Sequence, residues 1–367
     1  MGRPRPRREP VRRGLDSGVA VRARPARAGG RARTRRLRRA RGAGGARRRA
    51  AQVTGPSIYL TTSLVAGRAT VNDGVAEPDV DGREIISDVL TRFAPAPTGW
   101  LHFGHVLNAV YVWGTAKAMG GRVLLRIEDH DRVRSRPEYE AGILDDLDWL
   151  GFAADVFPTS AYRAGACEGR QSERDASYRE ALLILQRQGL VYACDCSRRA
   201  QNTATWGQTP ERPYDGRCRD RGLPLVDGCG WRVRMDPGVE RFDDAWLGEQ
   251  EQEPGAQCGD VLVRDRDGNW TYQFAVTVDD WRQDIGLVIR GVDLLASTGR
   301  QIRLARLLGR ERPPVFLHHP LIVKPDGRKL SKSDRDTGVR DRRARGWTAH
   351  EVIEAAARRA DLRGIDA

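Results

Sequence analysis

The stretch from Arg92 to Glu128 constrains the fold more than any other part of the chain. An apolar run at residues 88–93, which predicts a strand, leads into it, and a turn with two prolines and a glycine follows at residues 94–99. Residues 104–119 then place apolar side chains at three- and four-residue steps, and a Gly-Gly pair ends this predicted helix. A second apolar run follows at residues 123–127. This order predicts an α/β fold with a doubly wound parallel sheet, whose ligands bind beyond the carboxyl ends of the strands.

Two histidines, His102 and His105, stand where the turn enters the predicted helix. Backbone N–H groups at a helix start attract phosphate, and two imidazoles beside them favour a polyphosphate site. For an isolated HxxH pair, surface or capping groups are the commoner explanation. The residues that flank this pair favour the phosphate site.

Apolar periodicity predicts further elements downstream. Val261 to Phe274 is typical of a hairpin, with Asp267-Gly268 as its turn. The other expected elements are helices at residues 137–150, 173–188, 297–308 and 348–359 and a buried strand at residues 287–290.

Six cysteines with uneven spacing argue for a reducing compartment, and hence for a cytoplasmic protein. Cys194 and Cys196 are separated by one residue, and Cys218 follows beyond a polar loop. Two close thiolates and a third beyond a loop are typical of a metal site. Chemistry alone favours four sulfur ligands, with Cys229 as the fourth. A set of free buried thiols is the alternative.

The net charge of +14 belongs to the start of the chain. The first 50 residues hold 19 arginines and two acidic residues, so the rest of the chain is near neutral. Such an arm cannot bury enough apolar surface to order itself. It is consistent with an RNA-binding tail, an organellar targeting peptide, or a wrongly chosen start codon. The sequence contains no apolar run long enough to cross a membrane and no secretory signal pattern.

The motif RFAPAPTGWLHFGH, residues 92–105, resembles the first signature of class I aminoacyl-tRNA synthetases in the form used by the glutamyl branch. KLSKS, residues 329–333, resembles the second signature of that class, with Leu330 in place of Met. Only 34 residues follow, where a full glutamyl enzyme continues into an anticodon-binding part. With its cysteine spacing, the chain is similar to the glutamyl-Q tRNA(Asp) synthetases over about two thirds of its length.

The resemblance implies a class I synthetase fold of Rossmann type with a small zinc-binding insert, in a protein expected to be a monomer. It divides the chain into a basic arm (1–84), a first half of the sheet (85–190), the insert (191–270), a second half with the KLSKS loop (271–333) and a helical tail (334–367).

The resemblance also implies the reaction. L-glutamate is activated with ATP and Mg²⁺ without tRNA, and is then transferred to the queuosine base of tRNA(Asp). A guanidinium suits the substrate carboxylate because it donates two parallel charged hydrogen bonds. Ala96 stands where the family usually has Ser, so one hydroxyl contact to the substrate is expected to be absent. The competing hypotheses are a truncated glutamyl-tRNA synthetase that charges the tRNA 3′ end and a catalytically inactive RNA-binding module.

The site residues follow from the same resemblance, one motif position at a time. The expected glutamate contacts are Arg92, Phe93, Ala94, Pro95, Ala96, Glu128, Tyr272 and Arg290. The expected ATP contacts are His102, Gly104, His105, Lys329, Ser331 and Lys332. The residues expected to stabilise the transition state are His102, His105 and Lys332. The expected ligands of one structural Zn²⁺ are Cys194, Cys196, Tyr214 and Cys218, with Cys229 as a rival to the tyrosine.

Overall fold

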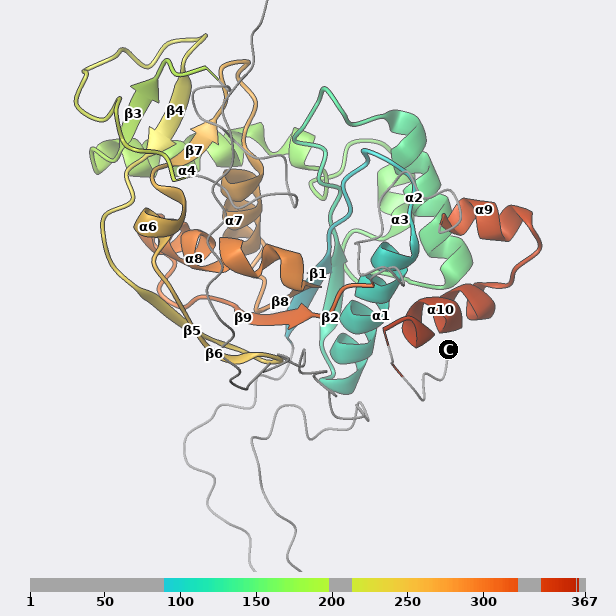
Figure 1. Ribbon diagram of the computed structural model, residues 1–367. Helices are drawn as coiled ribbons and strands as arrows, with labels where there is room; N and C mark the ends of the chain where they lie inside the picture. The colour runs from blue at the N-terminus through green and yellow to red at the C-terminus, as the bar shows by residue number, and fades with distance from the viewer. Residues whose placement is uncertain (1–88, 198–212, 323–337, 361, 363–367) are drawn as a thin grey trace, which may run out of the picture. The chain divides into compact units, whose positions relative to one another are not determined.

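The computed structural model describes residues 89–197, 213–322, 338–360 and 362, all within one unit of the chain, residues 55–367. These residues form a mostly parallel central sheet with helices packed on it, and a second, smaller antiparallel sheet (Figure 1). This arrangement confirms the α/β fold with a parallel sheet that the sequence predicts. None of the described helices is long and apolar enough to cross a lipid bilayer.

Within the described residues the central sheet has six strands, in the order β2-β1-β8-β9-β5-β6. Neighbouring strands are parallel except β5 and β6, which form an antiparallel hairpin. This hairpin is absent from the sequence prediction. It lies inside residues 191–270, so part of the segment expected to form an insert extends the central sheet. The strands are β1 (Leu90–Phe93), β2 (Arg122–Leu125), β5 (Glu240–Asp244), β6 (Gly248–Gln252), β8 (Leu287–Gly291) and β9 (Val315–His319).

Helix α1 (Phe103–Ala118) connects β1 to β2 and packs against both strands, as predicted. The helix stops at the Gly-Gly pair for two separate reasons. Gly120 adopts φ +63°, a left-handed conformation that favours glycine. A Cβ on Gly121 would stand only 2.4 Å from the carbonyl oxygen of Val89, so the return of the chain to the sheet excludes a side chain there.

The other described helices pack on these sheets or on one another. Helix α10 lies beside α1, as Figure 1 shows, and also contacts α2, while α7 packs against α4, α8 and β7. The helices predicted at residues 137–150, 173–188, 297–308 and 348–359 are confirmed within two residues at each end. The described helices are α2 (Pro137–Leu150), α3 (Thr159–Arg163), α4 (Asp175–Arg187), α6 (Pro254–Cys258), α7 (Tyr272–Arg282), α8 (Thr298–Leu307), α9 (Val339–Ala344) and α10 (Ala349–Arg358).

The smaller sheet consists of β3 (Val191–Cys194), β4 (Gly230–Val233) and β7 (Val261–Arg264), all antiparallel, in the order β3-β4-β7. It packs through α4 and α7, and its apolar core includes Val233 and Val263. The first of its strands ends at Cys194, so this sheet carries the start of the cysteine motif.

The hairpin predicted at residues 261–274 is wrong in its second half. Strand β7 ends at Arg264, and one bridge to Trp270 precedes the start of α7 at Tyr272. Every side chain of α7 from Gln273 to Asp280 is buried. A helix that is buried on all sides has no polar face, so its short apolar run cannot be told from a strand by periodicity.

Candidate active site

The carboxyl ends of β1 and β2 are joined by backbone hydrogen bonds. The N–H of Arg126 donates to the carbonyl oxygen of Phe93 at 2.9 Å, and the N–H of Glu128 donates to that of Pro95 at 3.0 Å. Strand β8 lies on the other side of β1 and ends near Arg290. Three predicted glutamate contacts therefore come from three adjacent strands.

These three side chains are buried: Arg92 is 5% exposed, Glu128 6% and Arg290 3%. A fourth predicted contact, Tyr272, stands in the first turn of α7 and interacts electrostatically with all three. The pKa of Tyr272 is raised to about 12, chiefly by burial and also by the charge of Glu128, against the opposing charges of Arg290 and Arg92. The four groups therefore form one charged cluster at the strand ends.

A fully buried arginine that sequence reasoning missed connects this charged cluster to α7. Arg126 lies 2.8 Å from Asp280, 3.1 Å from Glu128 and 3.9 Å from Asp279. Burial by itself lowers the pKa of Arg126, but the three carboxylates outweigh it and raise that pKa well above its usual value. Charged residues that interrupt two apolar runs, LLRIE and AVTVDDW, were the available sequence signal.

The same network holds Arg92. Its Nε lies 3.2 Å from Asp280 Oδ1, and its Nη1 donates to the carbonyl oxygen of Ile289 at 3.2 Å. The neighbouring Asp279 accepts hydrogen bonds from Arg174 at 2.6 Å and from the hydroxyl of Tyr178 at 2.9 Å. Both acidic residues of α7 are thus paired with arginines of the charged cluster or beside it.

Arg290 differs from Arg92 in the nature of its partners. Its Nε donates to His318 Nε2 at 3.0 Å, its Nη1 to Gln301 Oε1 at 2.6 Å and its Nη2 to Thr298 Oγ1 at 2.8 Å. Each of these acceptors is uncharged, and no carboxylate in the described part of the chain forms an ion pair with Arg290. Burial lowers the pKa of its guanidinium. A buried cation without an anionic partner is costly, so this position suits an anionic ligand.

The turn after β1 supplies the remaining predicted glutamate contacts. Pro95 is buried, whereas Ala94 and Ala96 are half-buried. The side chain of Phe93 is 3% exposed and packs against Trp113 in the core, with 5.3 Å between ring centroids. The ring of Phe93 therefore belongs to the apolar core and not to the charged cluster.

The two histidines cap the start of α1. His102 Nδ1 accepts from the N–H of Gly104 at 3.0 Å, and His105 Nδ1 accepts from the N–H of His102 at 3.1 Å. A Cβ on Gly104 would lie 2.9 Å from His102 Cε1, so glycine allows the first ring to fold back over the helix start. The capping interpretation describes this geometry, and the role of both rings towards ATP stays a prediction. The other predicted ATP contacts, Lys329, Ser331 and Lys332, lie outside the described residues.

A pocket of about 640 Å³ lies between α2, α3 and the loop that follows Glu128. Pro97 and Asp129 line it and are next in sequence to the predicted glutamate contacts Ala96 and Glu128. Arg132 and Arg136 line it further along the loop.

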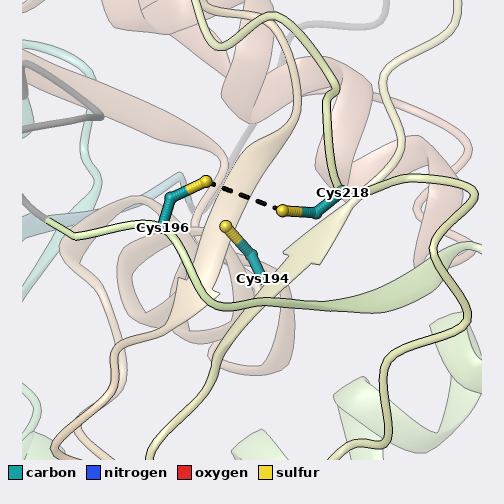
Figure 2. Close-up of side chains that lie close together, drawn as sticks. All are labelled: Cys194, Cys196 and Cys218. Atoms are coloured by element: carbon teal, nitrogen blue, oxygen red, sulfur yellow. Dashed lines mark hydrogen bonds between the residues drawn. The ribbon is translucent and has the colours of Figure 1, made fainter.

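The predicted metal ligands gather at the end of β3. The Sγ atoms of Cys194, Cys196 and Cys218 all lie within 4.8 Å of one another, and Figure 2 shows the three thiols turned towards a common point. The hydroxyl of Tyr214 lies 3.6 Å from Cys194 Sγ and accepts from the N–H of Cys218 at 3.1 Å. Cys229 is outside this group. Three thiols and an adjacent phenol form a donor set that can hold a metal ion.

Local packing explains how Tyr214 reaches the thiols. Its backbone pairs with Gly259, where a Cβ would stand 2.1 Å from the Tyr214 carbonyl oxygen. The guanidinium of Arg232 covers the Tyr214 ring at 3.7 Å from its centroid. The segment between Tyr214 and Cys218 is therefore fixed from two sides.

This chain is similar in sequence to a known protein family and to named relatives. Residues 88–361 match the family model of tRNA synthetases class I (E and Q), catalytic domain. A relative from Bordetella bronchiseptica named Glutamyl-Q tRNA(Asp) synthetase is 45% identical over 249 residues, covering 66% of this chain and 74% of that protein. A relative of the same name from Rhodobacter capsulatus is 39% identical over 283 residues, covering 72% of this chain and 98% of that protein.

A solved structure is similar as well. The glutamate tRNA ligase of Elizabethkingia meningosepticum, in complex with its amino acid, has 31% sequence identity and a TM-score of 0.58 over 68% of this chain. The match covers only 53% of that ligase, so this chain spans about half of its length. The residues matched by the family model include both signature motifs and the cysteine group. The chain therefore belongs to the glutamyl-Q tRNA(Asp) synthetases, within the class I aminoacyl-tRNA synthetases, and is an ATP-dependent ligase.

Proposed function

We propose that this enzyme activates L-glutamate with ATP in the absence of tRNA and transfers it to the queuosine base of tRNA(Asp). The observation that supports glutamate as the substrate is the buried Arg290, whose described partners are all uncharged; the transfer to queuosine rests on the family to which the chain belongs. The side-chain carboxylate of glutamate supplies the missing negative charge, and Glu128 receives the α-ammonium group. Glutamine leaves the guanidinium without that charge, which gives selectivity.

The proposed chemistry needs no protein nucleophile. An oxygen of the glutamate α-carboxylate attacks the α-phosphorus of ATP, the bond from that phosphorus to the bridging oxygen breaks, and pyrophosphate leaves. The products are glutamyl-adenylate and pyrophosphate, and Mg²⁺ supplies charge neutralisation on the phosphates when bound. The protein contributes positioning, the ring N–H groups of His102 and His105 as hydrogen-bond donors, and positive charge from Lys332.

We place the acceptor in the pocket between α2 and α3, because Pro97 and Asp129 in its lining are next in sequence to predicted glutamate contacts. The pocket is large enough for one unpaired nucleoside. A single-stranded anticodon-loop base can be splayed into such a pocket, whereas a paired base cannot. Arg132 and Arg136 offer positive charge for the adjoining phosphates.

The test supplies the protein with labelled glutamate and ATP, and with tRNA(Asp) that carries or lacks queuosine. We expect glutamate-dependent ATP–pyrophosphate exchange without any tRNA, and label on the queuosine-containing tRNA only. Label on the 3′ end of tRNA(Glu) would instead support a truncated glutamyl-tRNA synthetase. Absence of exchange with the native protein would support the inactive RNA-binding module.

We also propose that the cysteine group holds one structural Zn²⁺ with Tyr214 as the fourth ligand. Thiolates are preferred zinc ligands, and a site with four protein ligands has no open position for chemistry. Tyr214 is adjacent to the three thiols, whereas Cys229 is not.

Metal analysis of two single variants tests the zinc proposal. Native protein is expected to contain about one zinc per chain. Cys218→Ser should lose most of that zinc, because it removes one of three gathered thiolates, while Cys229→Ser should retain it. Equal zinc contents in the two variants would contradict this ligand set. Zinc-free native protein would end the proposal altogether.

A further inference from the structure

Arg290 and His318 are register partners on neighbouring parallel strands, β8 and β9. Paired residues of adjacent strands direct their side chains to the same face of a sheet. Here that places the Nε of Arg290 3.0 Å from Nε2 of His318. The imidazole is fully buried, so no water competes for its nitrogen.

The other nitrogen of His318 meets a carboxylate from the hairpin that sequence reasoning missed. His318 Nδ1 lies 2.6 Å from Oδ2 of Asp244, the last residue of β5. Asp244 Oδ1 accepts from the N–H groups of Trp246 at 3.0 Å and Leu247 at 2.9 Å. The turn of the β5–β6 hairpin therefore fixes the carboxylate, and the carboxylate fixes the ring.

These contacts determine where the ring carries its proton. A carboxylate accepts, so Nδ1 must be the protonated nitrogen and Nε2 the bare one. Nε2 then accepts from Arg290 Nε and from the hydroxyl of Thr298 at 3.2 Å. Burial lowers the pKa of His318, and the nearby Arg290 lowers it further against the opposing effect of Asp244. The ring therefore stays neutral and remains an acceptor.

The remaining N–H groups of Arg290 are the ones that can donate to a ligand. Nη1 and Nη2 each carry two hydrogens, and each donates one, to Gln301 and to Thr298. Among the described residues, one N–H on each of these two nitrogens has no acceptor. Two such donors form the fork that binds both oxygens of a carboxylate.

We propose that His318, oriented by Asp244, is a positioning residue that holds Arg290 with this fork directed at the side-chain carboxylate of the amino acid substrate. The inference rests on the proposed function, because it assigns that carboxylate to Arg290. It predicts that His318 controls the affinity for glutamate and its discrimination from glutamine, without contacting the substrate.

Two substitutions at one position test the inference. His318→Gln places an amide oxygen near the position of Nε2 and keeps an acceptor for Arg290. His318→Asn places an amide N–H near the position of Nδ1, where it still donates to Asp244, but loses the acceptor for Arg290. In glutamate-dependent ATP–pyrophosphate exchange, His318→Gln should stay within about threefold of the native KM for glutamate. His318→Asn should raise that KM about tenfold or more and reduce the glutamate-to-glutamine preference by a similar factor. The KM for ATP should not change in either variant.

Each result decides the matter. A similar KM for glutamate in both variants and the native enzyme would overturn the inference, and so would parallel increases in the KM for ATP, which indicate general damage. If His318→Asn does not fold, Asp244→Asn replaces it. That change retains an oxygen for the hairpin turn but turns an amide N–H towards Nδ1, which moves the ring proton to Nε2 and against Arg290. The same rise in KM for glutamate is then expected. A native enzyme without glutamate-dependent exchange would instead refute the proposed function itself.

Discussion

Replacement of Arg126 by methionine is expected to lower the free energy of unfolding by about 3–5 kcal/mol, the usual cost of removing one partner from a buried ion pair. Arg126 is fully buried and lies within 4.0 Å of Asp279, Asp280 and Glu128. Methionine fills a comparable volume but carries no charge. Arg92 and Arg174 still neutralise part of the acidic charge on α7, but Glu128 loses its ion pair.

Urea unfolding of the native and variant proteins measures this loss. Arg134→Met is the matched control, because Arg134 also pairs with a carboxylate, Asp131, at 2.5 Å, but its side chain is 70% exposed. An exposed pair of this kind contributes about 0–1 kcal/mol. If both variants lost the same small free energy of unfolding, Arg126 would not be the cation that stabilises the charged cluster.

Replacement of Lys332 by alanine is expected to reduce glutamate-dependent ATP–pyrophosphate exchange by about two to three orders of magnitude, or roughly 3 kcal/mol of transition-state stabilisation. Lys332 is the lysine of the second signature, and the sequence resemblance predicts that it contacts ATP. Its charge develops its full effect only as negative charge moves onto the departing pyrophosphate. The reduction should therefore fall on kcat more than on the KM for glutamate.

Lys324→Ala provides the control, since this lysine precedes the signature by five residues and lies in the same segment. The exchange rate of Lys324→Ala should remain within a fewfold of the native rate, and both variants should unfold at the native urea concentration. Near-native exchange by Lys332→Ala would remove this lysine from the mechanism.

The sequence predicted the elements whose signals are local. The helix after the first strand has an apolar face at regular steps and a Gly-Gly stop, and both features operate within a few residues. The same holds for α2 and α4, each followed by a glycine in the left-handed conformation, Gly151 and Gly189. Local signals of this kind survive in any tertiary context.

The elements that were missed depend on distant partners. Strand β5 buries Glu240 and Asp244 on the same face as Phe242, so it has no apolar alternation to recognise. These carboxylates are tolerated because Arg303 and His318 pair with them from other elements. Helix α7 was misassigned for the opposite reason, because tertiary burial removed its polar face.

The candidate site divides in the same way. Arg92, Glu128, Tyr272 and Arg290 could be proposed because they occupy motif positions, and the structure brings them together in one charged cluster. Their contact with glutamate stays a prediction. The residues that support them could not be predicted from the sequence. The contact of Arg126 with Asp280 spans 154 residues, and that of Asp244 with His318 spans 74. Such contacts require the strand order and register, which no local pattern encodes.

The two rings at the start of α1 have a consequence for how this motif can vary. Each one satisfies a backbone N–H that the helix itself leaves without an acceptor. A substitution chosen only for its charge would therefore also loosen the first turn of α1, and with it the spacing between the sheet and the start of this helix. Substitutions at either position are therefore restricted to side chains that can cap the start of a helix, whatever role they have towards a nucleotide.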